Sequence, residues 1–167
     1  MDDNYILRKN DSVDVSKWHD MVSGSPYATP FQTPQFYHFC CTVSRHQGMV
    51  CAIEGKDHKY HALCVADIVR ENGVKSYFSR RAIIYGGPLL LRDNQNAALE
   101  ILLENLHNEL KDQVIYIEIR NFKDYSPYRA VFVQQDWKYI PGFNVRNKLD
   151  FQNLNDLTAS FKYNRRR

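Results

Sequence analysis

The sequence predicts one mixed α/β (α+β) unit, in which helices cover both faces of a central, mostly antiparallel sheet. The chain has 167 residues, of which 44% are hydrophobic, and this is enough for one packed core. The hydrophobic spacing changes from helical to alternating and back, which gives the order β-α-α-β-β-β-α-β-α-β-α. Short turns join the strands in the middle of this order, and short turns favour antiparallel neighbours.

The first predicted elements are a short strand and two helices. Apolar residues at positions 5–8 predict the strand. Asp14 can cap a helix that ends before Gly24-Ser25-Pro26. Thr33-Pro34 supplies the N-cap and the first position of a second helix, which is expected to end near Arg45.

The middle of the chain predicts a meander of antiparallel strands. Alternating residues at 49–54 and 59–70 predict two strands joined by a turn at Gly55-Lys56-Asp57. A second turn leads to extended residues at 74–79 and 81–85.

The second half contains the clearest helix and the clearest strand. A leucine stripe predicts a helix from Asp93 or Asn94 to Leu110. Strict alternation then predicts a strand at 114–120, with its isoleucines on one face. Four further elements are expected: a short helix from Ser126-Pro127, strands at 137–140 and 143–150, and a helix at 154–163.

Composition and charge predict a soluble, cytoplasmic protein. The formal charge is only +3 at pH 7, which gives no reason to expect nucleic acid as the main partner, and no DNA binding is expected. The apolar runs are far shorter than the roughly 20 residues of a membrane span. Residues 1–4 are polar and acidic, unlike a secretory signal.

Several kinds of reactive site are not expected. Histidines and cysteines gather between positions 38 and 64, but only His58 and His61 have ligand-like spacing, so we expect no metal site. Cys40 and Cys41 lie within the second predicted helix and are interpreted as inert thiols. No phosphate-binding glycine loop occurs, and the loop by which acetyltransferases bind acetyl-CoA is also missing.

Three features remain as candidates, each with two readings. Gly86-Gly87-Pro88 is either a tight turn or a backbone surface that binds an anion. Glu118 and Arg120 share one face of a strand, where they form a structural ion pair or line a cavity. Arg81, near Tyr85, has the same two readings.

Two other basic features have simpler interpretations. Arg80 is expected to be a solvated surface charge. The arginines at 165–167 could hold an anionic partner such as phosphate, acidic lipid or RNA.

Three segments together resemble one known family. These are SPYATPFQTP at 25–34, RAIIYGGPLL at 81–90 and YIEIR at 116–120. They are similar to the Fem-type aminoacyltransferases that build peptidoglycan interpeptide bridges, which are relatives of the acetyltransferase-like (GNAT-fold) proteins. The resemblance covers the first half of that family. It implies an N-terminal acetyltransferase-like domain at 1–153 and, at 154–167, the start of a basic helix leading to a second such domain.

The resemblance also implies an activity. The chain would be the acceptor-side half of a two-domain acyl or aminoacyltransferase that acts on an amine of a cell-wall precursor or aminosugar. The implied donor is acyl-CoA or aminoacyl-tRNA, and the implied location is the cytoplasm, at the inner membrane face for a membrane-bound substrate. The implied substrate-binding residues are Arg81, Tyr85, Gly86, Gly87, Glu118 and Arg120, and the resemblance does not identify the catalytic residues or a general base.

Two alternatives from other classes stay open. One is a non-catalytic binding module of the same fold, and the other is an RNA-contacting domain that uses the arginine tail. The substrate-binding interpretation predicts that Gly87→Val impairs binding of the acceptor while the melting temperature changes by only a few degrees.

Overall fold

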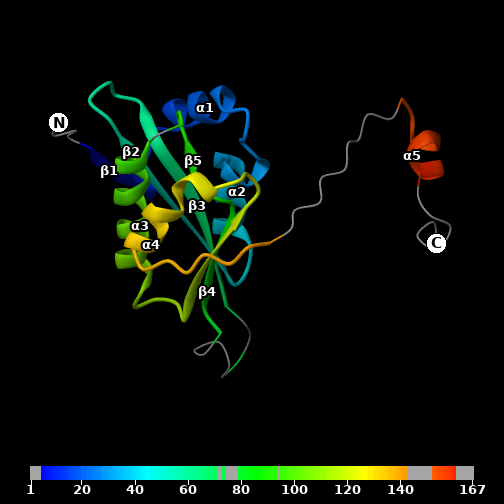
Figure 1. The fold of residues 1–167 in the computed structure, drawn as a ribbon. Helices are drawn as coiled ribbons and strands as arrows, with labels where there is room; N and C mark the ends of the chain where they lie inside the picture. The colour runs from blue at the N-terminus through cyan, green and yellow to red at the C-terminus, as the bar shows by residue number, and fades with distance from the viewer. Residues whose placement is uncertain (1–4, 71–72, 74–78, 94, 143–151, 161–167) are drawn as a thin grey trace.

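A computed structural model describes residues 5–70, 73, 79–93, 95–142 and 152–160. Six strands form one sheet in the order β1-β2-β3-β4-β6, and β5 pairs with β3 beside this path (Figure 1). The strands are β1 (Ile6–Lys9), β2 (His46–Glu54), β3 (Tyr60–Val69), β4 (Arg81–Gly86), β5 (Leu89–Leu90) and β6 (Tyr116–Asn121). Among the strands of the described residues, only β4 and β6 pair in parallel, so the prediction of a mostly antiparallel sheet is confirmed.

Helices cover both faces of this sheet, as predicted. The α-helices are α1 (Val15–Gly24), α2 (Pro34–Thr42), α3 (Asn96–Leu110), α4 (Arg129–Gln134) and α5 (Leu154–Ser160). Short 3-10 turns η1 (Asn10–Ser12), η2 (Pro30–Gln32) and η4 (Ser126–Tyr128) connect some of them. Figure 1 shows α1 and α2 on one side of the strands and α3 and α4 on the other. None of the helices in the described part of the chain has the length and hydropathy to cross a membrane.

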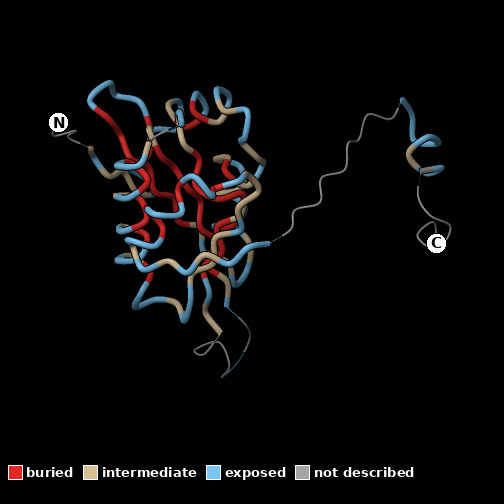
Figure 2. The backbone as a smooth tube through the Cα atoms, viewed as in Figure 1, coloured by how far each residue is buried: buried red, intermediate tan, exposed pale blue. Residues whose placement is uncertain are grey.

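The α3 side of the sheet holds the larger core. The leucines of α3 are fully buried against apolar residues of β2, β3 and β4, and Tyr125, Tyr128 and Phe132 close this core from the α4 side. Figure 2 shows the buried segments concentrated where α3 and the central strands meet. The leucine stripe read from the sequence is therefore the main contact of this face.

The α1–α2 side has a smaller core built from well-capped helices. The Asp14 carboxylate accepts hydrogen bonds from the amides of Ser16 and Lys17 at the start of α1, and the Thr33 hydroxyl accepts one from Phe36 at the start of α2. The buried side chains of this core come from α1 and the central strands: Trp18, Met21, Val50, Ala52, Leu63 and Val65.

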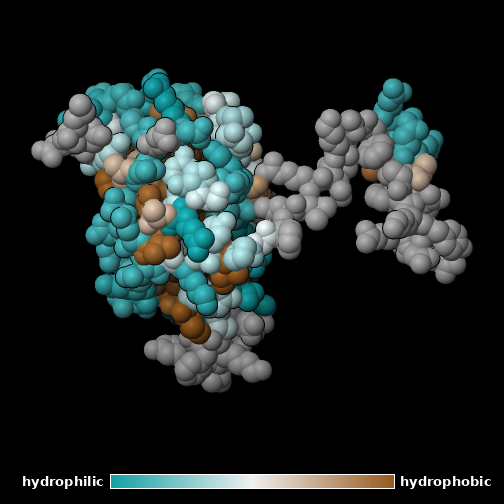
Figure 3. Space-filling view, in the orientation of Figure 1, coloured by the Kyte–Doolittle hydropathy of each residue, from teal (hydrophilic) through white to brown (hydrophobic). Residues whose placement is uncertain are grey.

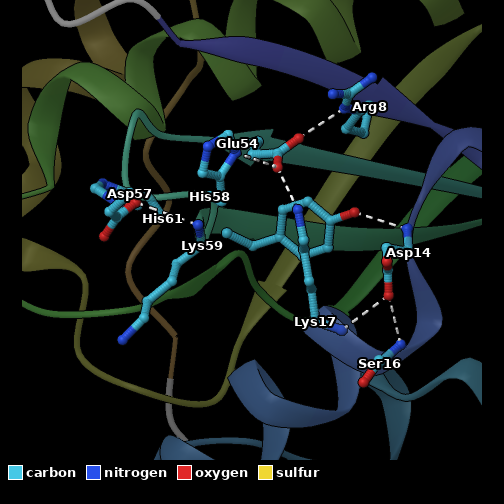
Figure 4. A network of polar contacts seen from close by, with 10 residues as sticks. Arg8, Asp14, Ser16, Lys17, Glu54, Asp57, His58, Lys59 and His61 are labelled. Atoms are coloured by element: carbon cyan, nitrogen blue, oxygen red, sulfur yellow. Dashed lines mark hydrogen bonds and ion pairs between the residues drawn. The ribbon is translucent and has the colours of Figure 1, made fainter.

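A polar network closes the end of the sheet at the β2–β3 hairpin (Figure 4). The buried Glu54 carboxylate accepts a hydrogen bond from Arg8 Nε at 2.7 Å and a second from Lys17 Nζ. These bonds, with the Lys17 bond as the largest cause, hold the pKa of Glu54 below its ordinary value. Tyr60 Oη accepts from the amide of Asp14 at 2.7 Å. The network therefore fixes α1 and β1 to the hairpin.

The region between β4 and β5 contains a bulge. Ile83 lies opposite Asp67 and Leu89 lies opposite Leu63, so this stretch holds two residues more than the β3 stretch it faces. Gly86 and Gly87, within it, have φ angles of 81° and 79°. Here β4 leaves β3 and continues its parallel pairing with β6.

Some predicted elements differ from the structure. The strand expected at 137–140 is wrong, because these residues have no strand pairing and Trp137 packs instead against the α3-side core. The second helix ends at Thr42, before Arg45, since β2 already begins at His46. The strands expected at 74–79 and 143–150 lie almost wholly outside the described residues, as does the end of the last helix beyond residue 160.

Candidate functional site

The three segments that resemble the Fem-type family meet at the β4–β5 bulge. Gln32, which is 1% exposed, donates from Nε2 to the carbonyl of Gly87 at 2.8 Å, and its Oε1 accepts from the amide of Thr29 at 2.9 Å. Trp18 Nε1 donates to the Gln32 carbonyl at 2.7 Å. On the third segment, β6 pairs with β4 so that Gly86 lies opposite Asn121. Segments far apart in the sequence thus form one junction.

The two glycines of this junction have no room for a side chain. A Cβ atom on Gly86 would lie 2.8 Å from Thr29 Oγ1, and one on Gly87 would lie 2.3 Å from Asn121 Oδ1. Both glycines are buried, and both have positive φ angles, a backbone conformation that is strained for residues with a side chain. The expectation that Gly87→Val changes the melting temperature by only a few degrees is therefore wrong, because the substitution would strain the bulge itself.

The side chains of Arg81, Tyr85, Glu118 and Arg120 lie on one face of the paired strands β4 and β6. The register sets Tyr85 opposite Arg120, and residues two apart on a strand share a face. Arg120 donates from Nε and Nη2 to the two Glu118 oxygens at 2.9 and 3.0 Å, and its guanidinium carbon lies 5.4 Å from the centre of the Tyr85 ring. This arrangement joins cation, carboxylate and aromatic ring on one open surface.

The pair of Glu118 and Arg120 is accessible to solvent. Its side chains are 40% and 46% exposed. Hydrogen bonds from Arg120 hold the pKa of Glu118 below its ordinary value, and the charge of Arg81 adds to this effect. Glu118 is therefore ionised at neutral pH. The interpretation as an ion pair and the interpretation as a cavity lining both apply in part, because the two side chains bond to each other and also line a cavity.

An aromatic wall that the sequence analysis missed lies beside this cluster. The Phe31 ring lies 5.2 Å from the Tyr85 ring, and the Phe36 ring lies 6.1 Å from both Tyr85 and Phe39. Phe39 is 52% exposed. The available signal was the position of Phe31 and Phe36 on either side of Thr33-Pro34, with Phe31 inside the first of the three resembling segments and Phe36 just after it.

A large cavity of about 1140 Å³ lies along β6. Its walls come from β6, the end of α3, α4 and residues 137–142, and they include Glu118 and Arg120. Arg81, Tyr85 and the two glycines are not part of its walls. Seen from the α3–α4 side, hydrophobic patches interrupt the hydrophilic surface of the molecule (Figure 3).

A second, small cavity lies against Gly86. Its volume of about 10 Å³ has room for about one water molecule. Lys123 closes it from outside, with Nζ 4.0 Å from the centre of the Tyr27 ring and 3.1 Å from Asp93 Oδ1. Gly86 is thus shielded, while the Tyr85–Glu118–Arg120 cluster is open.

The start of α3 does not fit the pyrophosphate of an acyl-CoA donor. Such a group needs free backbone amides, usually from glycines, before the helix. Residues 88–95 contain no glycine. The amide of Leu91 donates to the carbonyl of His61, and Gln95 Oε1 lies 3.1 Å from His61 Nδ1. The described residues therefore form no CoA cradle here.

The described residues contain neither a cluster that could bind a metal ion nor a buried thiol with a lowered pKa. No group of three or more histidines, cysteines or carboxylates could hold a metal ion in this part of the chain. Cys40, Cys51 and Cys64 are buried, and burial raises the pKa of Cys40 and of Cys51 to about 12. These thiols remain protonated at neutral pH.

Comparisons with known proteins identify the fold. No family model and no curated protein sequence matches the chain. The structure is similar to glucosamine-6-phosphate N-acetyltransferase from Arabidopsis thaliana, at a TM-score of 0.58 and 10% identity, over 88% of this chain and 99% of that one. It is also similar to the aminoglycoside 6'-N-acetyltransferase AAC(6')-Ih from Acinetobacter baumannii, at a TM-score of 0.55 and 11% identity, over 87% and 98%.

A third similar structure is an aminoglycoside N-acetyltransferase, AAC(6')-Iy, in complex with CoA. The TM-score is 0.57 at 8% identity, over 89% of this chain and 97% of that one. At such low identity these likenesses establish architecture alone. The chain has the acetyltransferase-like (GNAT) fold.

Proposed function

We propose that this chain is the acceptor-binding domain of an acyl or aminoacyltransferase that acts on the amine of an aminosugar or cell-wall precursor. One observation carries the proposal: the three family-like segments meet at the bulge and place Arg81, Tyr85, Glu118 and Arg120 on one open face. The similar acetyltransferases named above support amines as the acceptor class.

The chemistry of the open face suits an acceptor that carries both an amine and an anionic group. The ionised Glu118 can hold a ligand ammonium, and Arg120 can hold a phosphate or carboxylate through its guanidinium fork. The exposed ring of Phe39, which stacks on Phe36, offers an apolar surface to a sugar ring, and Phe36 in turn lies against Tyr85. Orientation of the acceptor is the contribution of this domain.

The donor is expected to bind elsewhere. The start of α3 has no CoA cradle, so the proposal assigns the acyl-CoA or aminoacyl-tRNA donor to a second domain that follows the helix begun at residue 154. In this proposal residues 1–153 form the acceptor domain, which works in the cytoplasm at the inner face of the membrane when its substrate is membrane-bound. Residues 1–167 by themselves would bind an acceptor without turnover.

A non-catalytic binding module of the same fold is the second candidate. It is favoured by the same observation at the start of α3, where the backbone amide of Leu91 is already bonded. The two candidates differ in one respect: only the first predicts acyl transfer once a donor-binding domain is supplied.

Calorimetric titration with glucosamine 6-phosphate and with a muramyl-peptide precursor tests acceptor binding. We expect Glu118→Gln and Arg120→Gln each to weaken binding about tenfold or more, because each removes one charge that holds the ligand. Glu109→Gln is the matched control, since the Lys9–Glu109 pair is similarly exposed and lies elsewhere. Equal weakening by Glu109→Gln, or no binding of either ligand to the wild type, would refute the proposal.

A further inference from the structure

Three arginines lie side by side at the end of the sheet opposite the hairpin. The amide of Arg70, just after β3, donates to the carbonyl of Arg45, just before β2, at 3.2 Å. Val69 lies opposite Arg81, so the next pair in this antiparallel register is Arg70 and Arg80. Because neighbouring strands are about 4.8 Å apart, the three backbone positions span about 10 Å.

These arginines have no counter-charge in the described part of the chain. No carboxylate there forms an ion pair with Arg45, Arg70 or Arg80. The opposite end of the sheet differs, because Arg8 and Lys17 are both held there by Glu54 (Figure 4). Among the described residues, cations are thus paired with a carboxylate at one end of the sheet and lie together without one at the other.

Arg80 supplies a second observation. The sequence predicts a solvated surface charge at this position, but the Nε atom of Arg80 is shielded from solvent and has no hydrogen-bond partner among the described residues. A shielded N–H without a partner costs free energy, more so on a charged group. An anion bound at the Arg80 guanidinium would offset this cost, and it would also reduce the repulsion among three cationic residues whose backbones are neighbours.

We propose that Arg45, Arg70 and Arg80 bind a small ligand that carries two or more linked phosphate groups. The planar fork of arginine matches phosphate oxygens, and a row of about 10 Å suits two or three linked phosphates. A nucleic acid is disfavoured because the chain as a whole has a formal charge of only +3. The site is distinct from the acceptor surface, because residues alternate along this strand. Arg81 lies on the acceptor face, and Arg80 beside it lies on the opposite face, with Ala82.

Calorimetric titration of the full chain with inorganic pyrophosphate, at about 150 mM salt, tests this site. We expect binding, and we expect the double variant Arg45→Gln/Arg70→Gln to weaken it at least about tenfold. Both residues are exposed, so the double variant should fold normally, as circular dichroism would verify. Arg80→Lys keeps the charge but removes the fork, and it should weaken binding as well.

Two controls separate this site from general surface charge and from the proposed acceptor surface. Arg92→Gln removes another exposed arginine, and Arg120→Gln removes the arginine of the proposed acceptor surface; both should leave pyrophosphate affinity unchanged. A nucleoside diphosphate that binds more tightly than pyrophosphate would identify a nucleotide as the source of the phosphates.

Three results would overturn the proposal. They are no pyrophosphate binding up to about 1 mM, an equal loss of affinity with Arg92→Gln, and tighter binding of a single-stranded RNA than of any diphosphate.

Discussion

The two faces of the β4–β6 pair differ sharply in what they contact. On the α3 side, Ala82 and Ile84 are buried against the leucines of α3, with Ile117 and Ile119 beside them. On the other side the same two strands carry Glu118 and Arg120, which are partly exposed to solvent, and Tyr85, which lies between Arg120 and the Phe31 ring. Alternate residues of one strand therefore have different environments: one set is buried in the core, and the other lies on the proposed acceptor surface.

The largest expected effect is on the closed face. Leu102→Ala should lower the free energy of unfolding by about 2–5 kcal/mol, because the fully buried side chain leaves a cavity in the α3-side core. Chemical denaturation measures this. The control is Leu154→Ala, at a residue that is 75% exposed, which should change stability by less than about 0.5 kcal/mol. Equal losses in the two variants would remove the distinction between the closed face and the surface.

Next in size is the bulge that joins the two faces. Gly87→Ala should cost about 1–3 kcal/mol, because the φ of 79° strains a side chain and the added Cβ meets Asn121. Gly24→Ala is the control, since nothing lies within 4 Å of a Cβ there and alanine favours a helix. Thermal denaturation that ranks Gly24→Ala as the more damaging change would contradict the bulge geometry.

A third prediction compares two carboxylates, the shielded Glu54 and the open Glu118. Glu54→Gln should cost about 1–3 kcal/mol near pH 7, where both hydrogen-bonded cations face an ionised carboxylate. The pKa of Glu54 is lowered in the folded state, so this contribution is present above the ordinary value of 4.5 and is lost as the pH falls through the folded pKa. Denaturant titrations of wild type and variant should converge at acidic pH. A difference in stability between wild type and variant that grows as the pH falls would contradict the predicted pH dependence.

The smallest expected effect on stability is that of Glu118→Gln. The Glu118–Arg120 pair is 40% and 46% exposed, and pairs at such sites contribute about 0–1 kcal/mol. A loss above about 2 kcal/mol, measured by the same denaturation, would make the pair structural and would weaken the contrast between the faces.

The sequence was most informative where local periodicity and burial coincide. The leucines of α3 repeat at helical spacing and are all buried, so both the helix and its packing face were predicted. The bulge was not predicted as such, because it is defined by a register against β3 that local sequence does not contain. The alternation at 137–140 predicted a strand, but Trp137 is partly buried by packing against the α3-side core without strand pairing.

The candidate site was predictable only in part. Glu118 and Arg120 stood out because two charges on one face of a strand need a partner or solvent, and each is the partner of the other. The aromatic wall of Phe31, Phe36 and Phe39 was missed, because aromatic residues at helical spacing also fit an ordinary core. The exposure of Phe39 emerges only when the position of α2 on the sheet is known.

The most direct test compares the effect of ligand binding on the two faces of β4 at two adjacent residues. Ile83 and Ile84 are neighbours on β4, with Ile84 in the α3-side core and Ile83 on the opposite face, in register with Glu118. We would label the isoleucine methyl groups and record NMR spectra during titration with glucosamine 6-phosphate. The account predicts that the Ile83 methyl resonance shifts and that the Ile84 resonance does not. A shift of Ile84 and Ile119 with Ile83 unchanged would contradict it, because the ligand would then bind on the side of α3.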